Sequence, residues 1–170
     1  RQGVIGVALS GNITIDAIVA QGCRPIGPTL RVVEGDRNEV TKVAAQFPQD
    51  EAEAQTPLEA LQELFQDLDE TDRQLAQESL FIGLAQSSFK QSLERGDFLI
   101  RILVGVDPNV GAIAIADRVR PGQRIQFHLR DAHTAQDDLA ALLETYRADH
   151  RDLVAPAGAL LFACNGRGTS

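Results

Sequence analysis

The sequence predicts an α+β fold built mainly from antiparallel hairpins and a meander, with helices covering the sheet or sheets. Three patterns support this class. Short apolar segments near the start of the chain are separated by turns rich in Gly and Asn, as in β-hairpins. A strongly periodic helical segment follows. Three strand-like segments joined by short turns then precede a last long helix, an order that favours α+β over a doubly wound sheet.

The first expected hairpin lies near the start of the chain. Residues 3–9 are almost entirely apolar, residues 13–19 alternate between apolar and polar, and the Ser-Gly-Asn sequence at 10–12 is a turn signal. Residues 22–28 contain two Pro and two Gly, which interrupt a hydrogen-bonded ladder. We therefore expect residues 22–28 to be irregular.

A second hairpin is expected from residues 30–33 and 39–43, which flank the Gly-Asp-Arg-Asn sequence at 35–38. After it, residues 48–55 are acidic and polar and show no apolar periodicity. We expect this stretch to be the linker between two parts of the chain.

The clearest helix begins after Thr56, which is a good N-cap. Pro57 suits the first helical position, and Glu59 completes a capping box. The residues that follow form one apolar stripe at helical spacing: Leu58, Leu61, Leu64, Phe65 and Leu68. Residues 71–77 are expected to add a short second helix.

Four strands are expected in the next part of the chain. Residues 80–85 form the first. Residues 98–106 are apolar apart from one Arg, so they are expected to be buried on both faces. Residues 112–116 form the third strand, and residues 125–129 alternate as in a half-buried strand. The last three segments are joined by short turns and therefore predict an antiparallel meander.

A long helix is expected to begin with either Asp131 or Thr134 as its cap and to end near His150. Its apolar face consists of Leu139, Leu142, Leu143 and Tyr146. Residues 157–163 then predict a final strand that leads directly into Cys164.

The charge of the chain argues against two classes of partner. The 170 residues carry a net charge of −8, and residues 48–80 contain ten acidic side chains but only one basic one, Arg73. Such a stretch is typical of a solvated helical face. An acidic chain repels phosphate backbones and anionic lipids, so we expect neither nucleic-acid nor membrane binding.

Motifs for nucleotides, metals and hydrolytic catalysis are absent from the sequence. It contains no GxGxxG, GxxxxGKS/T or GxSxG pattern, and its three His and two Cys lack metal-ligand spacing. We expect no cofactor, no metal and no free-standing enzyme. No apolar run is long enough to cross a membrane and no secretory signal opens the chain, so a cytoplasmic protein is expected. The chain contains no Met, which suggests a fragment or a processed product.

Two segments, residues 21–27 and 162–168, each combine a Cys with neighbouring Gly and Arg residues at the end of an apolar run. Gly lets a backbone approach a ligand closely, and an Arg fork suits a carboxylate or a phosphate. Taken alone, each segment is more simply explained by a packed Cys and an ordinary turn. The candidate ligand-binding residues are Cys23, Arg24, Pro25, Cys164, Asn165, Gly166 and Arg167.

Together, these segments and their surroundings resemble the FIST family, a sensory module of bacterial signalling proteins and certain F-box proteins. The sequence AQGCRPIGP at 20–28 resembles the end of the family's N-terminal half. The stretches LFIGLA at 80–85, DFLIRILVGVDPNVGAIAIADRVRPGQRIQFHLRDA at 97–132 and GALLFACNGRG at 158–168 resemble its C-terminal half. The similarity keeps its order along most of the chain and is far more specific than any single motif.

The resemblance implies a domain division and a function. Residues 1–47 correspond to the tail end of the FIST N-terminal domain, and residues 48–170 to a FIST C-terminal domain truncated at its C-terminus. The family is regarded as a sensor of small ligands, with amino acids proposed, which extends here to other small carboxylates. The chain is therefore expected to belong to an intracellular signalling protein that passes the signal to an output domain or a protein partner.

Three functions are compatible with the sequence. The first is the ligand sensor. The second is a protein-interaction module that recruits a substrate. The third is a thiol enzyme in which Cys164 uses His128 or His133 as base. No carboxylate that would orient either His is evident, and both positions are typical of solvated side chains, His128 on the polar side of its strand and His133 near a helix cap.

Both thiols are predicted to be free, because two Cys in a chain of this length do not form a disulfide framework. Counting thiols in the denatured, unreduced protein should titrate both Cys23 and Cys164. A count close to zero would contradict the expectation of a reducing compartment.

Overall fold

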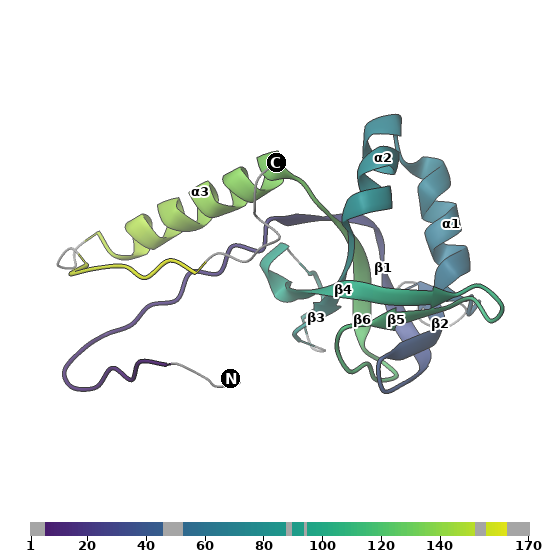
Figure 1. Ribbon diagram of the computed structural model, residues 1–170, viewed down its shortest axis with the longest axis horizontal. Coiled ribbons are helices and arrows are strands. Elements are labelled where there is room, and N and C mark those ends of the chain that lie inside the picture. Colours follow the sequence, from purple (N-terminus) through teal and green to yellow (C-terminus); the bar gives the residue numbers. More distant parts are fainter. Residues whose placement is uncertain (1–5, 46–52, 88–89, 94, 152–155, 163–170) are drawn as a thin grey trace, which may run out of the picture.

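The computed structural model describes residues 6–45, 53–87, 90–93, 95–151 and 156–162. In this part of the chain, six antiparallel strands close into one barrel in the order β1-β2-β5-β4-β3-β6, accompanied by three α-helices (Figure 1). The predicted α+β class is confirmed. The strands are β1 (Cys23–Asp36), β2 (Glu39–Ala45), β3 (Leu80–Ala85), β4 (Phe98–Asp107), β5 (Ala112–Ile115) and β6 (Arg124–Arg130). The helices are α1 (Pro57–Asp67), α2 (Glu70–Ser79) and α3 (Ala132–Asp149), and a single 3-10 turn spans Arg95–Asp97.

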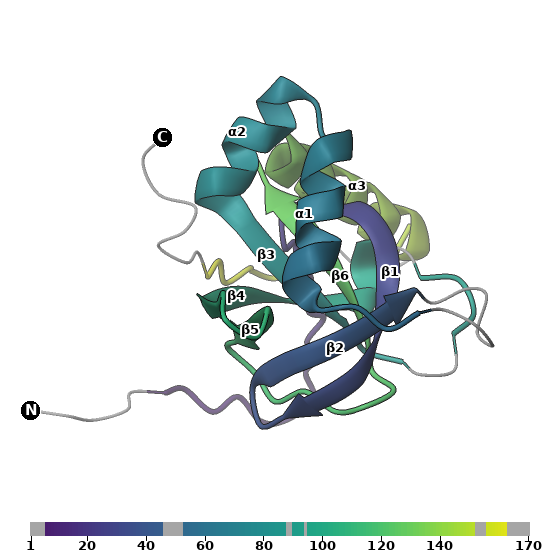
Figure 2. The same ribbon diagram turned by 90° about the vertical axis from the view of Figure 1, so that its right-hand side faces the viewer.

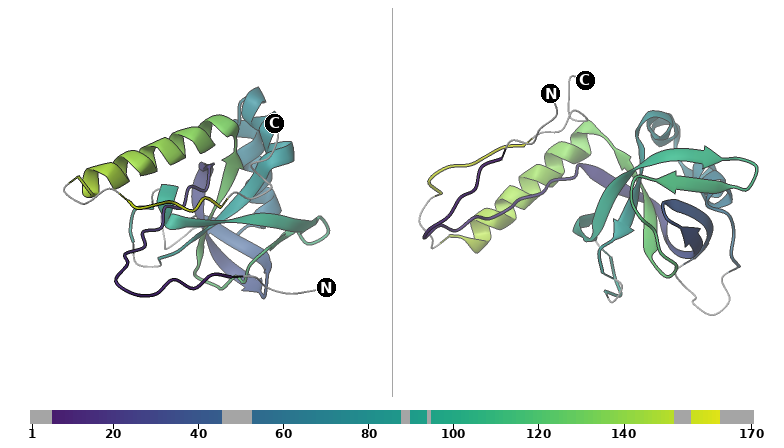
Figure 3. Two further views of the ribbon diagram at one scale, coloured as in Figure 1. Left: turned by 60° about the vertical axis from the view of Figure 1, so that its left-hand side comes forward. Right: turned by 60° about the horizontal axis from the view of Figure 1, so that its bottom comes forward.

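The hairpin of β1 and β2 confirms the second predicted hairpin. Val32 pairs with Val43, and Arg37 adopts a φ of 54° in the turn between the strands. The first predicted hairpin is wrong in the described residues 6–19, which form no strand. Their pattern suits a strand, but a strand also needs a hydrogen-bonding partner. Here these residues are exposed, and only their later part runs beside α3 (Figure 3).

The prediction that residues 22–28 are irregular is wrong, because β1 already begins at Cys23. Up to Ile26 this strand pairs with β6, whereas its pairing with β2 starts only at Leu30. Pro25 therefore lies where one side of the strand has no ladder partner, and Gly27, with a φ of 62°, lies within a break in register. Pro and Gly are tolerated in strands at such edges and bulges.

The predicted meander is only half present. β4 pairs with β5 as expected, with Leu103 opposite Ile115. β6 does not lie beside β5. It lies between β1 and β3, where His128 is opposite Phe81. The reason is closure of the barrel, in which β2 takes the place beside β5.

The predicted first helix is confirmed as α1. The Thr56 side chain accepts a hydrogen bond from the Glu59 backbone N–H at 3.2 Å, and the Glu59 carboxylate accepts one from the Thr56 N–H at 2.8 Å. The short second helix is confirmed as α2, with Asp69 as its N-cap. Arg73 joins the two helices by donating to the backbone carbonyl of Leu68 at 2.9 Å. Both helices lie on the same side of the barrel (Figure 2).

Apolar side chains from the strands and from α1 and α2 form the core. Ile, Val and Leu dominate it, in a chain of which 5% of the residues are aromatic. Its most enclosed members are Val32, Val40, Val43, Ile82, Ile113, Ile115, Ile125, Phe127 and Leu129.

Helix α3 confirms the last predicted helix and settles its cap as Asp131. The apolar face of α3 packs less closely than predicted. Leu139 and Leu143 are 37% and 38% exposed, and Thr134 is the one buried residue of the helix. The helix extends away from the barrel, and the segment that leads into β1 and residues 156–162 run alongside it (Figures 1 and 3). The strand predicted at 157–163 is also wrong, since residues 157–162 form none and Ala163 lies outside the described residues.

Strand β4 is not buried on both faces, contrary to the prediction from its apolar sequence. Ile102 and Val104 are 60% and 63% exposed. Their face points outward from the barrel, where no described element covers it beyond the first residues of the strand. No helix among the described residues has the length and apolar character needed to cross a membrane.

Close packing of β3 against β6 makes Gly83 sensitive to substitution. A Cβ at Gly83 would lie 2.5 Å from the His128 ring and 3.0 Å from the Phe98 Cβ, whereas one at Gly105 would meet nothing within 4 Å. Gly83→Ala should therefore lower the free energy of unfolding by about 1–3 kcal/mol, measured by denaturant titration. Gly105→Ala is the matched control on an open strand surface. Equal stability of the two variants would mean that His128 does not pack on β3 as described.

Candidate functional site

Two polar side chains, Cys23 and His128, are buried on the outward-facing side of the barrel wall, where β1, β6, β3 and β4 lie side by side. Cys23 and His128 share this face because Cys23 is opposite Arg130, two residues along β6 from His128. Cys23 is 2% exposed and His128 is fully buried. The prediction of a solvated His128 is thus wrong. The ring lies edge-on to Phe98, with centroids 5.1 Å apart, and its Nδ1 is 3.0 Å from the Gln126 carbonyl oxygen.

A cavity of about 290 Å³ opens beside Cys23, between this part of the barrel wall and α3. Three elements enclose it: the segment that enters β1, the start of β4 and the middle of α3. Its lining is Val19, Gln21, Cys23, Gly96, Ile100, Asp138, Ala141, Leu142 and Thr145.

Gln21 anchors the segment that enters β1 to the free edge of β4. Its side-chain Nε2 donates to the Phe98 carbonyl at 2.5 Å, and its Oε1 accepts from the Ile100 N–H at 2.9 Å. Because β4 pairs with β5 only from Leu103 onward, this edge has no ladder partner at Phe98 and Ile100. The Gln21 amide therefore takes the place of one residue of a neighbouring strand.

Asp138 connects α3 to the same segment. Its Oδ2 accepts a hydrogen bond from the Gly22 backbone N–H at 3.1 Å. Cys23 follows directly, and its Sγ donates to the Gln21 carbonyl at 3.5 Å. The wall of the cavity is thus held by one contact from α3 and two from β4.

Arg24 lies on the opposite side of β1 from Cys23, as alternation along a strand requires. Its guanidinium donates to the Asp72 carboxylate of α2 and, through Nε at 3.3 Å, to the Asp131 carboxylate that caps α3. The hydrogen bond to Asp72 is the main cause that raises the pKa of Arg24. Arg24 therefore joins β1 to two helices and does not face the cavity.

Asp131 has a lowered pKa. Burial alone would raise it, but the Thr134 hydroxyl and N–H donate to the carboxylate at 2.5 and 2.6 Å, and Arg24 adds a positive charge, so the pKa falls below its usual range. The helix cap and the ion pair thus depend on the same ionised carboxylate.

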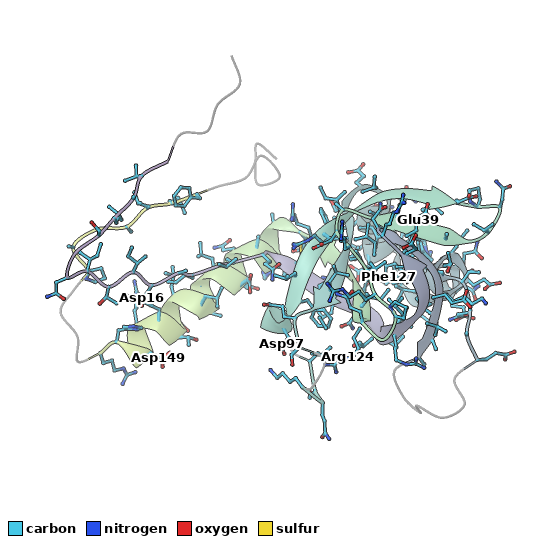
Figure 4. All side chains as sticks on the ribbon, turned by 90° about the horizontal axis from the view of Figure 1, so that it is seen from below. Asp16, Glu39, Asp97, Arg124, Phe127 and Asp149 are labelled. Atoms are coloured by element: carbon cyan, nitrogen blue, oxygen red, sulfur yellow. The ribbon has the colours of Figure 1, made fainter. Side chains whose placement is uncertain are left out.

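A second cluster holds the extended segment at the far end of α3. Tyr146 donates to Asp16 at 3.3 Å and stacks on His150, with ring centroids 4.1 Å apart. His150 Nε2 lies 3.7 Å from the Asp16 carboxylate. Figure 4 shows Asp16 beside the end of α3 that carries Asp149.

The candidate residues from the sequence have different positions. Cys23 lines the cavity, Arg24 is ion-paired on the other face, and Pro25 is exposed on β1. The candidates near the C-terminus lie outside the described residues: Cys164, Asn165, Gly166 and Arg167. Sequence reasoning missed Gln21, Asp138 and Thr145. Asp138 carried no distinguishing signal in the sequence, because it follows Gln136 and Asp137 in a polar part of the helix.

No group of three or more His, Cys, Asp or Glu side chains within the described ranges is placed to hold a metal ion. A second hollow, of about 310 Å³, lies between α1 and the bulge of β1 at Gly27. Its floor is formed by core residues such as Leu64 and Phe127, and its rim carries Glu63 and Asp67. None of the candidate ligand-binding residues in the described part of the chain lines it.

Comparison with known families identifies the class of protein. Residues 57–170 match the FIST C domain and residues 1–46 match the FIST N domain, so the chain belongs to the FIST family. The family resemblance seen in the sequence is confirmed. FIST domains are generally described as small-ligand sensory domains of signalling proteins.

The relatives are mycobacterial. The chain is 39% identical over 166 residues to an uncharacterized protein of Mycobacterium bovis and to one of Mycobacterium tuberculosis, and 36% identical to a further uncharacterized protein of Mycobacterium tuberculosis. In each case the similarity covers 98% of this chain but 40% of the relative. No solved structure matches the chain.

The Arg24 ion pairs should make stability depend on pH. Arg24→Gln should lower the free energy of unfolding at pH 7 by about 1–2 kcal/mol, because two carboxylates lose their partner. The folded-state pKa of Asp131 is lowered, so its contribution is present above the unfolded value of about 3.9 and is lost as the pH falls through the lower folded value. The difference in the free energy of unfolding between the unmodified chain and Arg24→Gln should therefore become smaller below about pH 4.

The matched control for this measurement is Lys42→Gln, which removes an exposed pair with Glu34. At neutral pH, Lys42→Gln should lower the free energy of unfolding by no more than about 0.5 kcal/mol. If Arg24→Gln lowers the free energy of unfolding by the same amount at pH 7 and at pH 3, the role given to Asp131 is contradicted.

Proposed function

We propose that this chain is a small-ligand-binding sensory domain of a cytoplasmic signalling protein, and that the cavity beside Cys23 is its ligand site. The ligand class that the family suggests is an amino acid or another small carboxylate. The observation that supports the proposal is the cavity itself, which is lined by described residues of β1, β4 and α3.

The lining of the cavity suits a small, partly apolar molecule. Val19, Ile100, Ala141 and Leu142 provide apolar walls, and a few polar groups lie among them. This composition is usual for small-molecule sites, and the volume of about 290 Å³ suits a ligand smaller than a drug-sized molecule.

The position of α3 explains how binding would be reported. Among its residues only Thr134 is buried, so the rest of the helix has little packing of its own to fix its place. Four residues of α3 line the cavity, and its cap is tied to β1 and α2 through Arg24. A ligand would therefore stabilise one position of α3 relative to the barrel, which an output domain or a protein partner could then read.

A second candidate function, a protein-interaction module, is favoured by a different observation. The segment at 156–162 exposes Leu160, Leu161 and Phe162, which are 75%, 89% and 88% accessible. Exposed apolar patches of this kind mark interaction sites. We treat this function as compatible with sensing, because the same surface lies beside α3 (Figure 3).

The proposal assigns binding rather than catalysis to the domain. His128 is fully buried against Phe98, and His133 is an exposed residue of the first turn of α3, where its Nδ1 lies 2.9 Å from Asp137. A general base has to reach the reacting group of a substrate. Neither position supports the thiol-enzyme alternative.

A ligand screen with a cavity-filling variant tests this proposal. Thermal unfolding of the chain with single amino acids and small carboxylates should reveal a stabilising compound, which adds about 2.7 kcal/mol at about 100 times its Kd. Leu142→Trp should remove that stabilisation by filling the cavity. Leu139→Trp is the control, because Leu139 is on the same helix but does not line the cavity.

Two results would contradict the proposal. One is a screen in which no compound stabilises the chain. The other is a stabilising compound that acts equally on Leu142→Trp and on the unmodified chain, since such a compound binds elsewhere.

A further inference from the structure

The described side chains that line the cavity carry a negative charge and no positive charge. Among the lining residues that the structure describes, the ionisable side chains are Cys23 and Asp138, and none is a Lys, Arg or His. The cationic neighbour in the sequence, Arg24, points to the opposite face of β1 and is paired with Asp72 and Asp131. The described part of the cavity therefore offers a fixed negative charge and no positive one.

The hydrogen-bonding groups show the same bias. Each described side-chain donor group of the lining donates one hydrogen bond to a backbone carbonyl: Gln21 Nε2 to Phe98, Cys23 Sγ to Gln21 itself, and the Thr145 hydroxyl to Ala141, at 3.0 Å. Only Gln21 Nε2 has a second hydrogen left to donate. Acceptor capacity remains. A carboxylate accepts about four hydrogen bonds, and Asp138 receives one from Gly22, while the Thr145 oxygen has lone pairs available. The cavity thus offers acceptors to a ligand that donates.

We propose that the cavity recognises a small primary amine with a short apolar body, with Asp138 as the counter-ion of its ammonium group. This inference rests on the proposed function and names the ligand chemistry of the same site. An ammonium group supplies three donors and no acceptor, which matches the acceptors of Asp138 and Thr145. Val19, Ile100 and Leu142 would enclose a short branched hydrocarbon.

A ligand carboxylate fits the same lining poorly. It would lose its hydration and be repelled by Asp138, and among the described lining side chains it would gain no cation and, as a donor, only the second Nε2 hydrogen of Gln21. An amino acid presents both groups, so its ammonium end is expected to be the part that the described lining recognises. A free amine should therefore suffice for binding, and the equivalent carboxylic acid should not.

The test uses three probes of similar shape: 3-methylbutylamine, 3-methylbutanoate and leucine. Calorimetric titration of the whole chain should show binding of the amine and no measurable binding of the acid. Asp138→Asn should weaken amine binding by about 10-fold or more, because a charged hydrogen bond is lost. The Asn side-chain oxygen can still accept from Gly22, so the variant is expected to fold.

The matched control is Asp137→Asn, which removes the neighbouring carboxylate on the exposed side of α3. It should leave the amine affinity within about twofold, because an exposed charge contributes little. Unequal effects of the two variants separate a local counter-ion from the general attraction of an acidic protein for a cation. Equal weakening by both variants would overturn the inference.

The outcomes also separate this inference from the function on which it rests. Binding of 3-methylbutanoate, or of leucine alone, that is lost in Leu142→Trp but unchanged in Asp138→Asn would overturn the ammonium inference and leave the sensory cavity supported. A failure of all three probes, together with an unproductive amino-acid screen, would overturn both.

Discussion

The pairing of β1 with two strands distant from each other in sequence is the interaction on which the rest of the structure depends. β1 pairs with β2 on one side and with β6 on the other, and the second pairing closes the barrel. It also sets the direction of every side chain at the start of the strand. Cys23 turns outward to the cavity and Arg24 turns to α2 and the cap of α3, so one strand positions both the ligand site and the helices beside it.

The parts of the fold that were predictable from the sequence are those fixed by local interactions. The capping box at Thr56 and Glu59, the turn between β1 and β2 and the start of α2 each depend on residues a few positions apart. The errors concern contacts between distant residues. Residues 22–28 look irregular until β6 supplies a ladder on one side, and residues 6–19 look like a hairpin although no described strand pairs with them.

The candidate site was predictable only in part, for the same reason. Cys23 was recognised by its neighbours in sequence, and it does line the cavity. Gln21 and Asp138 were missed because their roles depend on the free edge of β4 and on the approach of α3, neither of which leaves a local signal. Arg24 illustrates the opposite error, since a side chain suited to an anionic ligand is paired instead with carboxylates of the same chain.

The closed barrel has a consequence for how this family is divided into modules. β1 and β2 fall within the region that matches the FIST N domain, and the other four strands fall within the region that matches the FIST C domain. In the described residues, the boundary between the two matches therefore passes through a single hydrogen-bonded ring, and the two matched stretches share one core. In evolution, an exchange of one region without the other would remove two adjoining strands from the ring, so the two regions are expected to have been inherited and to have diverged together.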